Sequence, residues 1–320
     1  MFKNHNVNPK ATSEINTGFG VNSSDYGGRF LNKNGQPNIE KKGVGYLEKI
    51  SWYHVLLEMP RFKFLSVILI FYFIVNLLFG FIYFLLGSDK LAGIVSFPAL
   101  KKFEETFFFS CQTFTTVGYG RISPAGFLAS SISSLEALIG LLSLAVVTGL
   151  LYGRFSRPKA FIRFSSNAVL APFHNGRAVM FRLAPFKNNT LTDAEAKVTL
   201  GLIVEEQGKP VNKFYQLELE YNSINSLTLS WTIVHPITET SPFYNFTRED
   251  FEHAQGEILV FVKAFDDMFS NTVVARTSYT LNEIIIGAKF NPMYQKSENE
   301  NKTLLHLNKL NSVKLVNVDV

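Results

Sequence analysis

Two long apolar stretches place the strongest constraint on how this chain folds. Phe62–Leu86 carries a single charged residue, Lys63, near its start. Ala125–Phe155 holds one acidic residue, Glu136, ahead of Arg154. Each stretch exceeds the ~20 apolar residues that an α-helix needs to cross a bilayer. The first lies too far along the chain and is too long for a signal-peptide core, so both are predicted to be membrane-spanning helices.

Basic residues flank both stretches on the sides that face away from the loop between them. They are Lys41, Lys42, Lys49, Arg61 and Lys63 before the first stretch, and Arg154, Arg157, Lys159 and Arg163 after the second. The connecting loop holds fewer net positive charges, because Asp89, Glu104 and Glu105 partly offset Lys90, Lys101, Lys102 and Arg121. The positive-inside rule therefore predicts that both termini are cytoplasmic. Much of the net charge of +5 lies at this membrane edge, and the soluble part has no basic run interleaved with aromatics. We therefore expect no nucleic-acid partner.

The segment between the two stretches contains a phenylalanine-rich run followed by a glycine motif. Phe103–Thr115 is too short to span a bilayer and is predicted to be a re-entrant half-helix. The hexamer TTVGYG at Thr115–Gly120 follows it. Non-helical backbone at membrane depth is tolerated only where protein buries it or a watery cavity borders it. The C-terminal end of a half-helix is electronegative and favours a cation in such a cavity.

The TTVGYG hexamer is the type of loop that forms the selectivity filter of potassium channels. Backbone carbonyls of four such loops replace the hydration shell of the ion. Glycines permit the positive φ angles that let neighbouring carbonyls face one axis. Tyr119 is expected to brace the loop from outside. The predicted filter comprises Thr116, Val117, Gly118, Tyr119 and Gly120, with K+ bound at Thr116 through Tyr119.

The remaining chain divides into an N-terminal region and a C-terminal β domain. Residues 1–45 are polar and predicted to be loosely ordered, whereas 46–60 predict an amphipathic helix on the membrane surface. Residues 61–157 form the predicted pore domain. From 158 to 295, short alternating runs and a hairpin signal at His174–Arg177 predict a β-sandwich. The tail at 296–320 has no firm prediction. The expected strands are Ala178–Leu183, Val198–Val204, Gln216–Tyr221, Leu227–Val234, Glu257–Val262 and Thr272–Tyr279.

Several further motifs carry a resemblance to a known family. They are YGRFSRP at Tyr152–Pro158, FSSNAV at Phe164–Val169, SWTIVHPI at Ser230–Ile237, SPFY at Ser241–Tyr244, and ARTSY with NEIIIG within Ala275–Gly287. With TTVGYG, they make the chain resemble the inward-rectifier potassium channel family, in its prokaryotic (KirBac-type) branch, from about Arg29 to Tyr294. The extracellular cysteine pair of the eukaryotic branch is absent, since Cys111 is the only cysteine.

The resemblance implies a fold, a location and a set of partners. The fold is a membrane α-helical pore, with two transmembrane helices and a re-entrant pore helix and filter, followed by a C-terminal all-β immunoglobulin-like sandwich. The chain is expected to form a homotetramer in a bacterial inner membrane and to contact anionic lipids. K+ is the transported ion and no cofactor is expected. Cytoplasmic Mg2+ or polyamines are the expected blockers.

The family pattern also assigns supporting roles around the filter. An acidic pore-helix residue normally pairs with a basic residue beyond the filter; here Gln112 occupies the acidic position and Arg121 follows the loop. Glu136 is expected to lie behind the filter, because ionisable groups at membrane depth are usually functional. The alternative is that Glu136 caps nearby backbone donors.

One face of the second stretch is expected to line the pore. Ala137, Leu141, Leu144, Thr148 and Tyr152 recur at helical spacing. By resemblance, Leu144 occupies the position where strong rectifiers carry an acid, which implies weak rectification. Tyr152 matches the inner gate, with an interfacial aromatic as the alternative. Gly140 is interpreted as a hinge or, equally, as a site of close helix packing.

Two further groups of residues are expected to act on the cytoplasmic side of the membrane. The predicted anionic-lipid contacts are Arg61, Lys63, Arg154, Arg157 and Lys159, which alternatively only set topology. The predicted cytoplasmic constriction loop is Ala264, Phe265, Asp266, Asp267 and Met268. Asp266 and Asp267, with Glu205 and Glu206, are expected to add acidic charge to a vestibule or simply to be solvated.

The sequence gives an enzyme interpretation no support, because it holds no nucleophile elbow, Walker loop or metal-ligand spacing. The predicted function is passive potassium conduction. It is gated at the inner helix bundle and regulated by anionic lipid and the cytoplasmic domain. Two alternatives remain open: a non-conducting membrane-tethered sensor of lipid or ligand, and a poorly selective cation channel.

Overall fold

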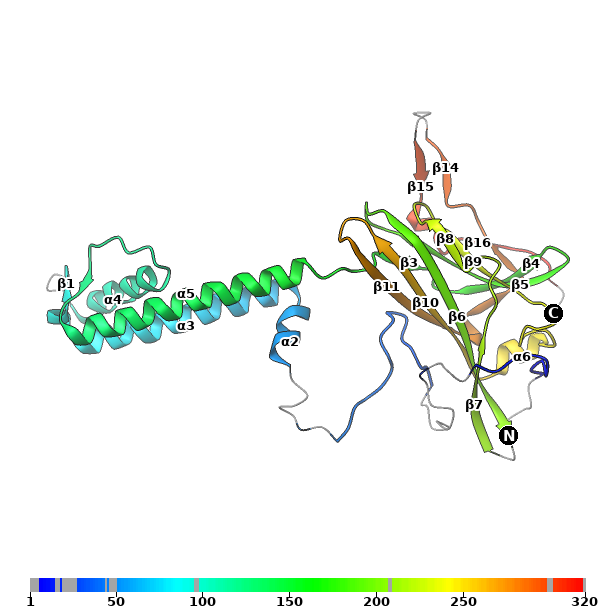
Figure 1. Ribbon diagram of the computed structural model, residues 1–320, viewed down its shortest axis with the longest axis horizontal. Coiled ribbons are helices and arrows are strands. Elements are labelled where there is room, and N and C mark those ends of the chain that lie inside the picture. The colour runs from blue at the N-terminus through cyan, green and yellow to red at the C-terminus, as the bar shows by residue number, and fades with distance from the viewer. Residues whose placement is uncertain are drawn as a thin grey trace. The chain divides into compact units, whose positions relative to one another are not determined.

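A computed structural model describes residues 6–14, 18, 28–43, 45, 51–94, 98–206, 209–297 and 302–318. The chain forms two compact units, of which Figure 1 shows the element order. The helical unit is Lys42–Arg157. The β unit combines Met1–Lys41 with Pro158–Val320.

The helical unit contains the two predicted spans. Its helices are α2 (Trp52–Glu58), α3 (Arg61–Leu86), α4 (Ala99–Phe114) and α5 (Phe127–Phe155), with a short helix η1 (Ser88–Lys90) and a two-residue ribbon of β1 (Leu91–Ala92) and β2 (Ser123–Pro124). At a rise of 1.5 Å per residue, α3 and α5 are roughly 39 and 43 Å long, more than a bilayer core requires. Both are apolar enough to cross a membrane, as predicted.

The half-helix α4 packs against both spans through glycines. A Cβ at Gly80 of α3 would lie 2.9 Å from Phe107 Cα, and one at Gly140 of α5 would collide with the Phe114 carbonyl. Small residues allow such close approach of helix backbones. Buried Phe79, Tyr83 and Phe109 fill the space around these contacts.

The β unit is a sandwich of two five-stranded sheets around one core. One sheet has the order β11-β10-β6-β7 with β8 beside β6, and the other has the order β12-β4-β5-β3 with β9 beside β5. The strands are β3 (Ile162–Phe164), β4 (Ala168–Phe173), β5 (Gly176–Pro185), β6 (Leu191–Glu206), β7 (Lys209–Gln216), β8 (Ser223–Ser226), β9 (Trp231–Pro236), β10 (Gly256–Asp266), β11 (Asn271–Thr280) and β12 (Ile284–Ile286). A helix, α6 (Arg248–His253), and a turn, η2 (Leu281–Glu283), complete this part.

Four of the six predicted strands lie inside observed strands. The second half of Leu227–Val234 lies in β9, and Gln216–Tyr221 was wrong beyond its first residue. β7 ends at Gln216, and β9 begins only at Trp231. Leu217 and Leu227 are nevertheless buried, and each bonds to the sheet through one backbone amide. Their apolar pattern therefore reflects core packing rather than strand pairing. The predicted hairpin joins β4 and β5, with His174 in the turn at φ 49°.

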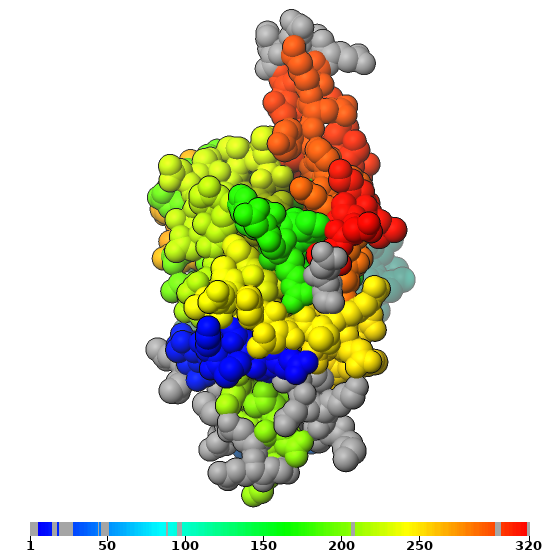
Figure 2. Space-filling view, turned by 90° about the vertical axis from the view of Figure 1, so that its right-hand side faces the viewer, coloured from blue at the N-terminus to red at the C-terminus, as the bar shows by residue number. Residues whose placement is uncertain are grey.

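Described parts of both terminal regions bond to the sandwich, although residues 1–45 were predicted to be loosely ordered and the tail had no firm prediction. Asn8 donates to the carbonyls of Glu239 and Ser241, and Arg29 pairs with Glu283 at 2.9 Å. Two C-terminal strand pairs extend the unit: β13 (Ala288–Phe290) with β16 (Val313–Leu315), and β14 (Tyr294–Lys296) with β15 (Thr303–Leu305), followed by η3 (Leu307–Lys309). Figure 2 shows the β14–β15 hairpin standing out from the body. Long-range polar bonds and buried apolar contacts hold these segments, and composition reveals neither.

Candidate ion-conduction pore

The filter loop has an alternating backbone. Thr116, Gly118 and Gly120 have φ angles of 60°, 53° and 81°, and the residues between them do not share this conformation. Thr116 is a non-glycine residue in a sparsely populated region, the kind of local strain that gathers at functional sites. The alternation turns successive peptide planes, as a column of inward-facing carbonyls requires.

The C-terminus of α4 holds the start of this loop. Val117 N and Gly118 N donate to the Gln112 carbonyl at 2.9 and 3.2 Å, and Thr116 N donates to Thr113 O at 3.0 Å. Gln112 therefore supports the loop through its backbone. Any displacement of the last turn of α4 would be passed directly to the filter.

Arg121 forms an ion pair that the sequence interpretation did not contain. Its guanidinium pairs with Glu105 of α4, whereas no bond between the side chains of Gln112 and Arg121 is found among the described residues. Glu105 lies about two helical turns before Gln112, so both occupy one face of α4. That spacing is the signal that could have identified Glu105, which was counted only as charge balance in the loop.

Glu136 is fully buried behind α4. Its carboxyl accepts a bond from Tyr83 Oη at 2.6 Å and forms a shorter one with Ser110 Oγ. The neighbouring Asn76 lies 3.1 Å from the same serine oxygen. These partners are side chains, so the alternative in which Glu136 caps backbone donors is not what the structure contains. Asn76, Tyr83 and Ser110 were missed, although each is a polar group in an apolar stretch.

The outward face of α5 carries the predicted pore-lining residues. Leu141, Leu144, Thr148 and Tyr152 are exposed in the single chain, whereas Ser133, Glu136 and Gly140 are buried on the opposite side. Gly140 faces the Phe114 backbone too closely for any side chain. This geometry favours the packing alternative for Gly140, and the lining and gate roles remain predictions.

Comparison with known proteins decides the family. Residues 162–320 match the family described as inward rectifier potassium channel C-terminal domain, and residues 65–157 match the ion channel family. The inward rectifier potassium channel Kirbac3.1 of Paramagnetospirillum magnetotacticum is 35% identical over 267 residues, covering 82% of this chain and 88% of that protein. The chain belongs to the inward rectifier potassium channel family.

Human members of the family are more distant relatives. Inward rectifier potassium channel 18 and the ATP-sensitive inward rectifier potassium channel 12, both of Homo sapiens, are each 26% identical over 299 residues. Each alignment covers 86% of this chain and 68% of the relative. A solved structure of the sporulation control protein Spo0M from Bacillus subtilis matches with a TM-score of 0.19 and 11% identity, over 44% of this chain and 62% of that chain, which carries no argument. This inward rectifier is thus a membrane potassium channel with a pore unit and a C-terminal all-β domain.

Of the five predicted lipid-contacting residues, Arg154 and Arg157 contact other protein groups and the other three are exposed. The Arg154 guanidinium donates to the carbonyls of Leu56, Leu57 and Met59 and lies 4.4 Å from the centre of the Phe64 ring. Its charge therefore holds α2 against α5, which differs from a free lipid contact. Arg157 lies 3.7 Å from Glu58. Arg61, Lys63 and Lys159 are exposed, with Lys159 in the β unit.

The predicted constriction loop is the hairpin tip between β10 and β11. Asp266 is buried and accepts bonds from Met268 N at 2.9 Å and Asn189 Nδ2 at 2.7 Å. Its carboxylate stabilises the turn, so the expectation of a solvated or vestibule charge is wrong at Asp266. Asp267, Phe265 and Met268 are exposed, Ala264 is buried, and Glu205 is exposed at the end of β6. The Glu206 side chain lies outside the described residues.

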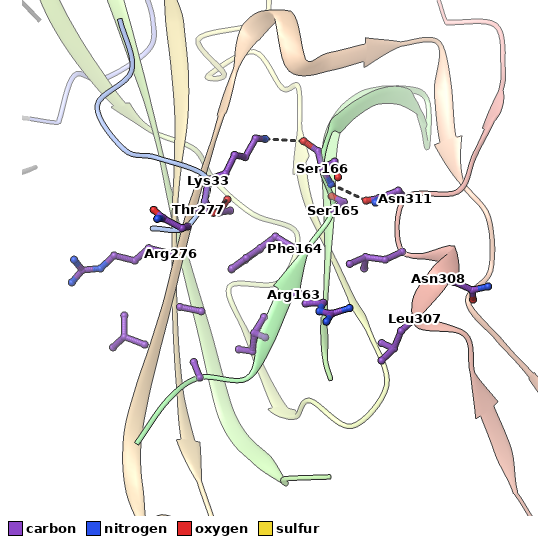
Figure 3. A pocket seen from close by; sticks show the side chains of 16 residues that line it. Lys33, Arg163, Phe164, Ser165, Ser166, Arg276, Thr277, Leu307, Asn308 and Asn311 are labelled. Atoms are coloured by element: carbon purple, nitrogen blue, oxygen red, sulfur yellow. Dashed lines mark hydrogen bonds between the residues drawn. The ribbon is translucent and has the colours of Figure 1, made fainter. Parts of the chain in front are cut away.

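The channel's β unit also holds a cavity of about 620 Å³ between the N-terminal segment, β3, β11 and η3 (Figure 3). Lys33, Arg163 and Arg276 line it, and its lining contains no acidic residue. Lys33 Nζ donates to the Ser166 carbonyl at 2.7 Å and pairs with Glu283 at 3.0 Å. Burial lowers the pKa of Lys33 despite these partners. The cavity is therefore lined by basic side chains, and the contacts with Ser166 and Glu283 hold the Lys33 side chain in place.

Proposed function

We propose that four copies of this chain enclose a potassium-selective pore that conducts ions passively. The observation that supports this proposal is the backbone of the loop, in which Thr116, Gly118 and Gly120 have positive φ angles and the residues between them do not. The loop is hydrogen-bonded to α4 and yet exposed. Val117 and Tyr119 are 53% and 78% exposed, so one chain supplies only one wall around an ion. A membrane potential supplies about 2.3 kcal/mol per charge per 100 mV, without covalent chemistry.

Flux from reconstituted full-length protein tests this proposal. We expect potassium flux that barium blocks and a potassium-to-sodium permeability ratio far above one. A ratio near one would instead establish the poorly selective channel. Absence of flux in every lipid mixture would favour the non-conducting sensor.

The gate is assigned to Tyr152. Four such rings near the axis would form an apolar constriction that closes by dewetting. Replacing Tyr152 by alanine is therefore expected to raise basal flux several-fold, roughly the effect of removing about 1 kcal/mol of gating preference. Tyr152→Phe retains the ring and serves as the control. Unchanged basal flux in Tyr152→Ala would leave Tyr152 as an interfacial aromatic.

Rectification is proposed to be weak. Leu144 presents no carboxylate to cytoplasmic Mg2+ or polyamines, so these cations lose their electrostatic partner in the cavity. We expect current–voltage curves that change little when spermine is added to the cytoplasmic side. Steep voltage-dependent block by spermine would show that another acidic group replaces the missing one.

Regulation by anionic lipid is assigned to Arg61 and Lys63, which are exposed at the start of α3. Each basic side chain near an anionic surface contributes roughly 1 kcal/mol. This assignment fits a bacterial inner membrane with both termini in the cytoplasm. Flux compared between neutral liposomes and liposomes with anionic lipid measures the sign of the effect. The alternative, in which these charges only set topology, predicts no difference.

A further inference from the structure

Four buried polar side chains form a closed cluster in the helical unit. Asn76 and Tyr83 come from α3, Ser110 from α4 and Glu136 from α5, and each has 0% exposed surface. Tyr83 Oη donates to one Glu136 oxygen at 2.6 Å, and Ser110 Oγ contacts the other. Asn76 Oδ1 lies 3.1 Å from Ser110 Oγ. The cluster thus joins all three helices of the pore.

The donors in this cluster can be counted. The Asn76 amide nitrogen donates to the Tyr72 carbonyl at 2.8 Å, so the amide oxygen must face Ser110 and can only accept. Ser110 carries one hydroxyl proton, yet both of its neighbours are acceptors if Glu136 is ionised. One of the two contacts would then lack a proton. A proton on Glu136 fills the gap, because the acid donates to Ser110 and Ser110 donates to Asn76.

The surroundings of Glu136 point to the same protonation state. In the described parts of the helical unit, the ion pairs are Lys90 with Asp89, Arg121 with Glu105 and Arg157 with Glu58, and none involves Glu136. Tyr83 of α3 and Cys111, which follows Ser110 on α4, carry a phenol and a thiol, and both groups are uncharged near neutral pH. An ionised carboxylate at membrane depth without a cation is strongly disfavoured.

We propose that Glu136 is a neutral acid and that an unbroken run of hydrogen bonds, Tyr83 to Glu136 to Ser110 to Asn76, fixes the pore helix to both spanning helices. The four are positioning residues for the proposed potassium conduction, on which this inference rests. Ser110 lies two residues before Gln112, whose carbonyl holds Val117 N and Gly118 N. The run therefore sets the position of the filter through a neutral acid, in addition to the ion pair of Arg121 with Glu105.

Glutamine at position 136 is the direct test, because an amide reproduces the neutral acid. Its nitrogen donates to Ser110 and its oxygen accepts from Tyr83. Full-length Glu136→Gln in liposomes is expected to keep potassium flux and the potassium-to-sodium permeability ratio within about twofold of the native channel. Glu136→Ala and Ser110→Ala leave buried polar groups unpaired and are expected to lower both readouts about tenfold. Ser66→Ala, which removes an exposed hydroxyl bonded within α3, is the matched control.

Infrared difference spectra of the native channel and Glu136→Gln provide a readout that does not need conduction. We expect a protonated-carboxyl band at neutral pH in the native channel that the variant loses. A difference spectrum with carboxylate bands alone overturns the proposal. Loss of flux in a tetrameric Glu136→Gln equal to that in Glu136→Ala also overturns it. Absence of flux from the native channel defeats the proposed function instead, and the infrared band then decides the state of Glu136.

Discussion

Replacing Gly140 by alanine is expected to collapse potassium flux and ion selectivity together. The added Cβ would collide with the Phe114 carbonyl oxygen and lie 2.8 Å from its carbon and 3.1 Å from its Cα. These are backbone atoms of the last residue of α4, so no side-chain rotation relieves the overlap. Overpacking of this kind costs about 1–3 kcal/mol, and here the strain displaces the residue next to the filter loop. We expect flux to fall about tenfold or more and the permeability ratio to move toward one.

Gly149 supplies the control for this experiment on the same helix. A Cβ at Gly149 meets no atom within 4 Å in the single chain, and alanine is favoured over glycine in a helix by about 1 kcal/mol. Gly149→Ala should therefore retain flux and selectivity. If Gly140 acts only as a hinge, Gly140→Ala would change open probability in single-channel recordings and leave selectivity intact. That result would contradict the packing role.

The membrane part of the fold could be predicted because its signals are local. Apolar length alone indicated α3 and α5, and a short aromatic run before Thr115–Gly120 indicated the half-helix α4. A bilayer permits few arrangements of such segments, since backbone polar groups must be satisfied internally. The expected organisation of pore and β domain then followed from the motifs.

The partners of charged residues could not be predicted in the same way. Arg121, which follows the filter, pairs with Glu105 of α4. Arg154 of α5 holds the carbonyl of Leu57 in α2 and that of Met59 after it. The distribution of charge along the sequence does not distinguish one such residue from another. Their roles depend on which backbone groups and carboxylates the tertiary fold brings within reach. Asp266 shows the same limit, because its burial under a hairpin turn has no signature in the sequence.

Acidification is expected to destabilise the β unit through His235. The imidazole is buried between β9 and the residues that follow β7, with Nδ1 2.6 Å from the Glu218 carbonyl and Nε2 2.8 Å from Ser241 Oγ. A carbonyl only accepts, so Nδ1 donates and Nε2 must accept from the serine hydroxyl. Burial lowers the pKa of His235 to about 4, from 6.5 in the unfolded chain. The folded unit therefore holds the neutral ring.

The pH window follows from these two pKa values. Above pH 6.5 the ring is neutral in both states, and His235 adds no pH dependence. As the pH falls from 6.5 toward 4, the unfolded chain binds a proton that the folded unit excludes, so the unfolding free energy decreases by roughly 3 kcal/mol in total. Trp231, buried in the β unit, can report unfolding in denaturant once the exposed Trp52 is replaced by phenylalanine.

His235→Gln isolates the contribution of the ring, because glutamine can donate to one partner and accept from the other without titrating. Carboxylates also titrate at low pH; Glu283, whose pKa is lowered by Arg29 and Lys33 despite its burial, is one of them. Those groups are unchanged in the variant, so subtracting its unfolding free energies from those of the native channel removes them. The difference should shrink by about 3 kcal/mol between pH 7 and pH 4. A difference that stays constant over this range would show that the folded unit admits the charged ring.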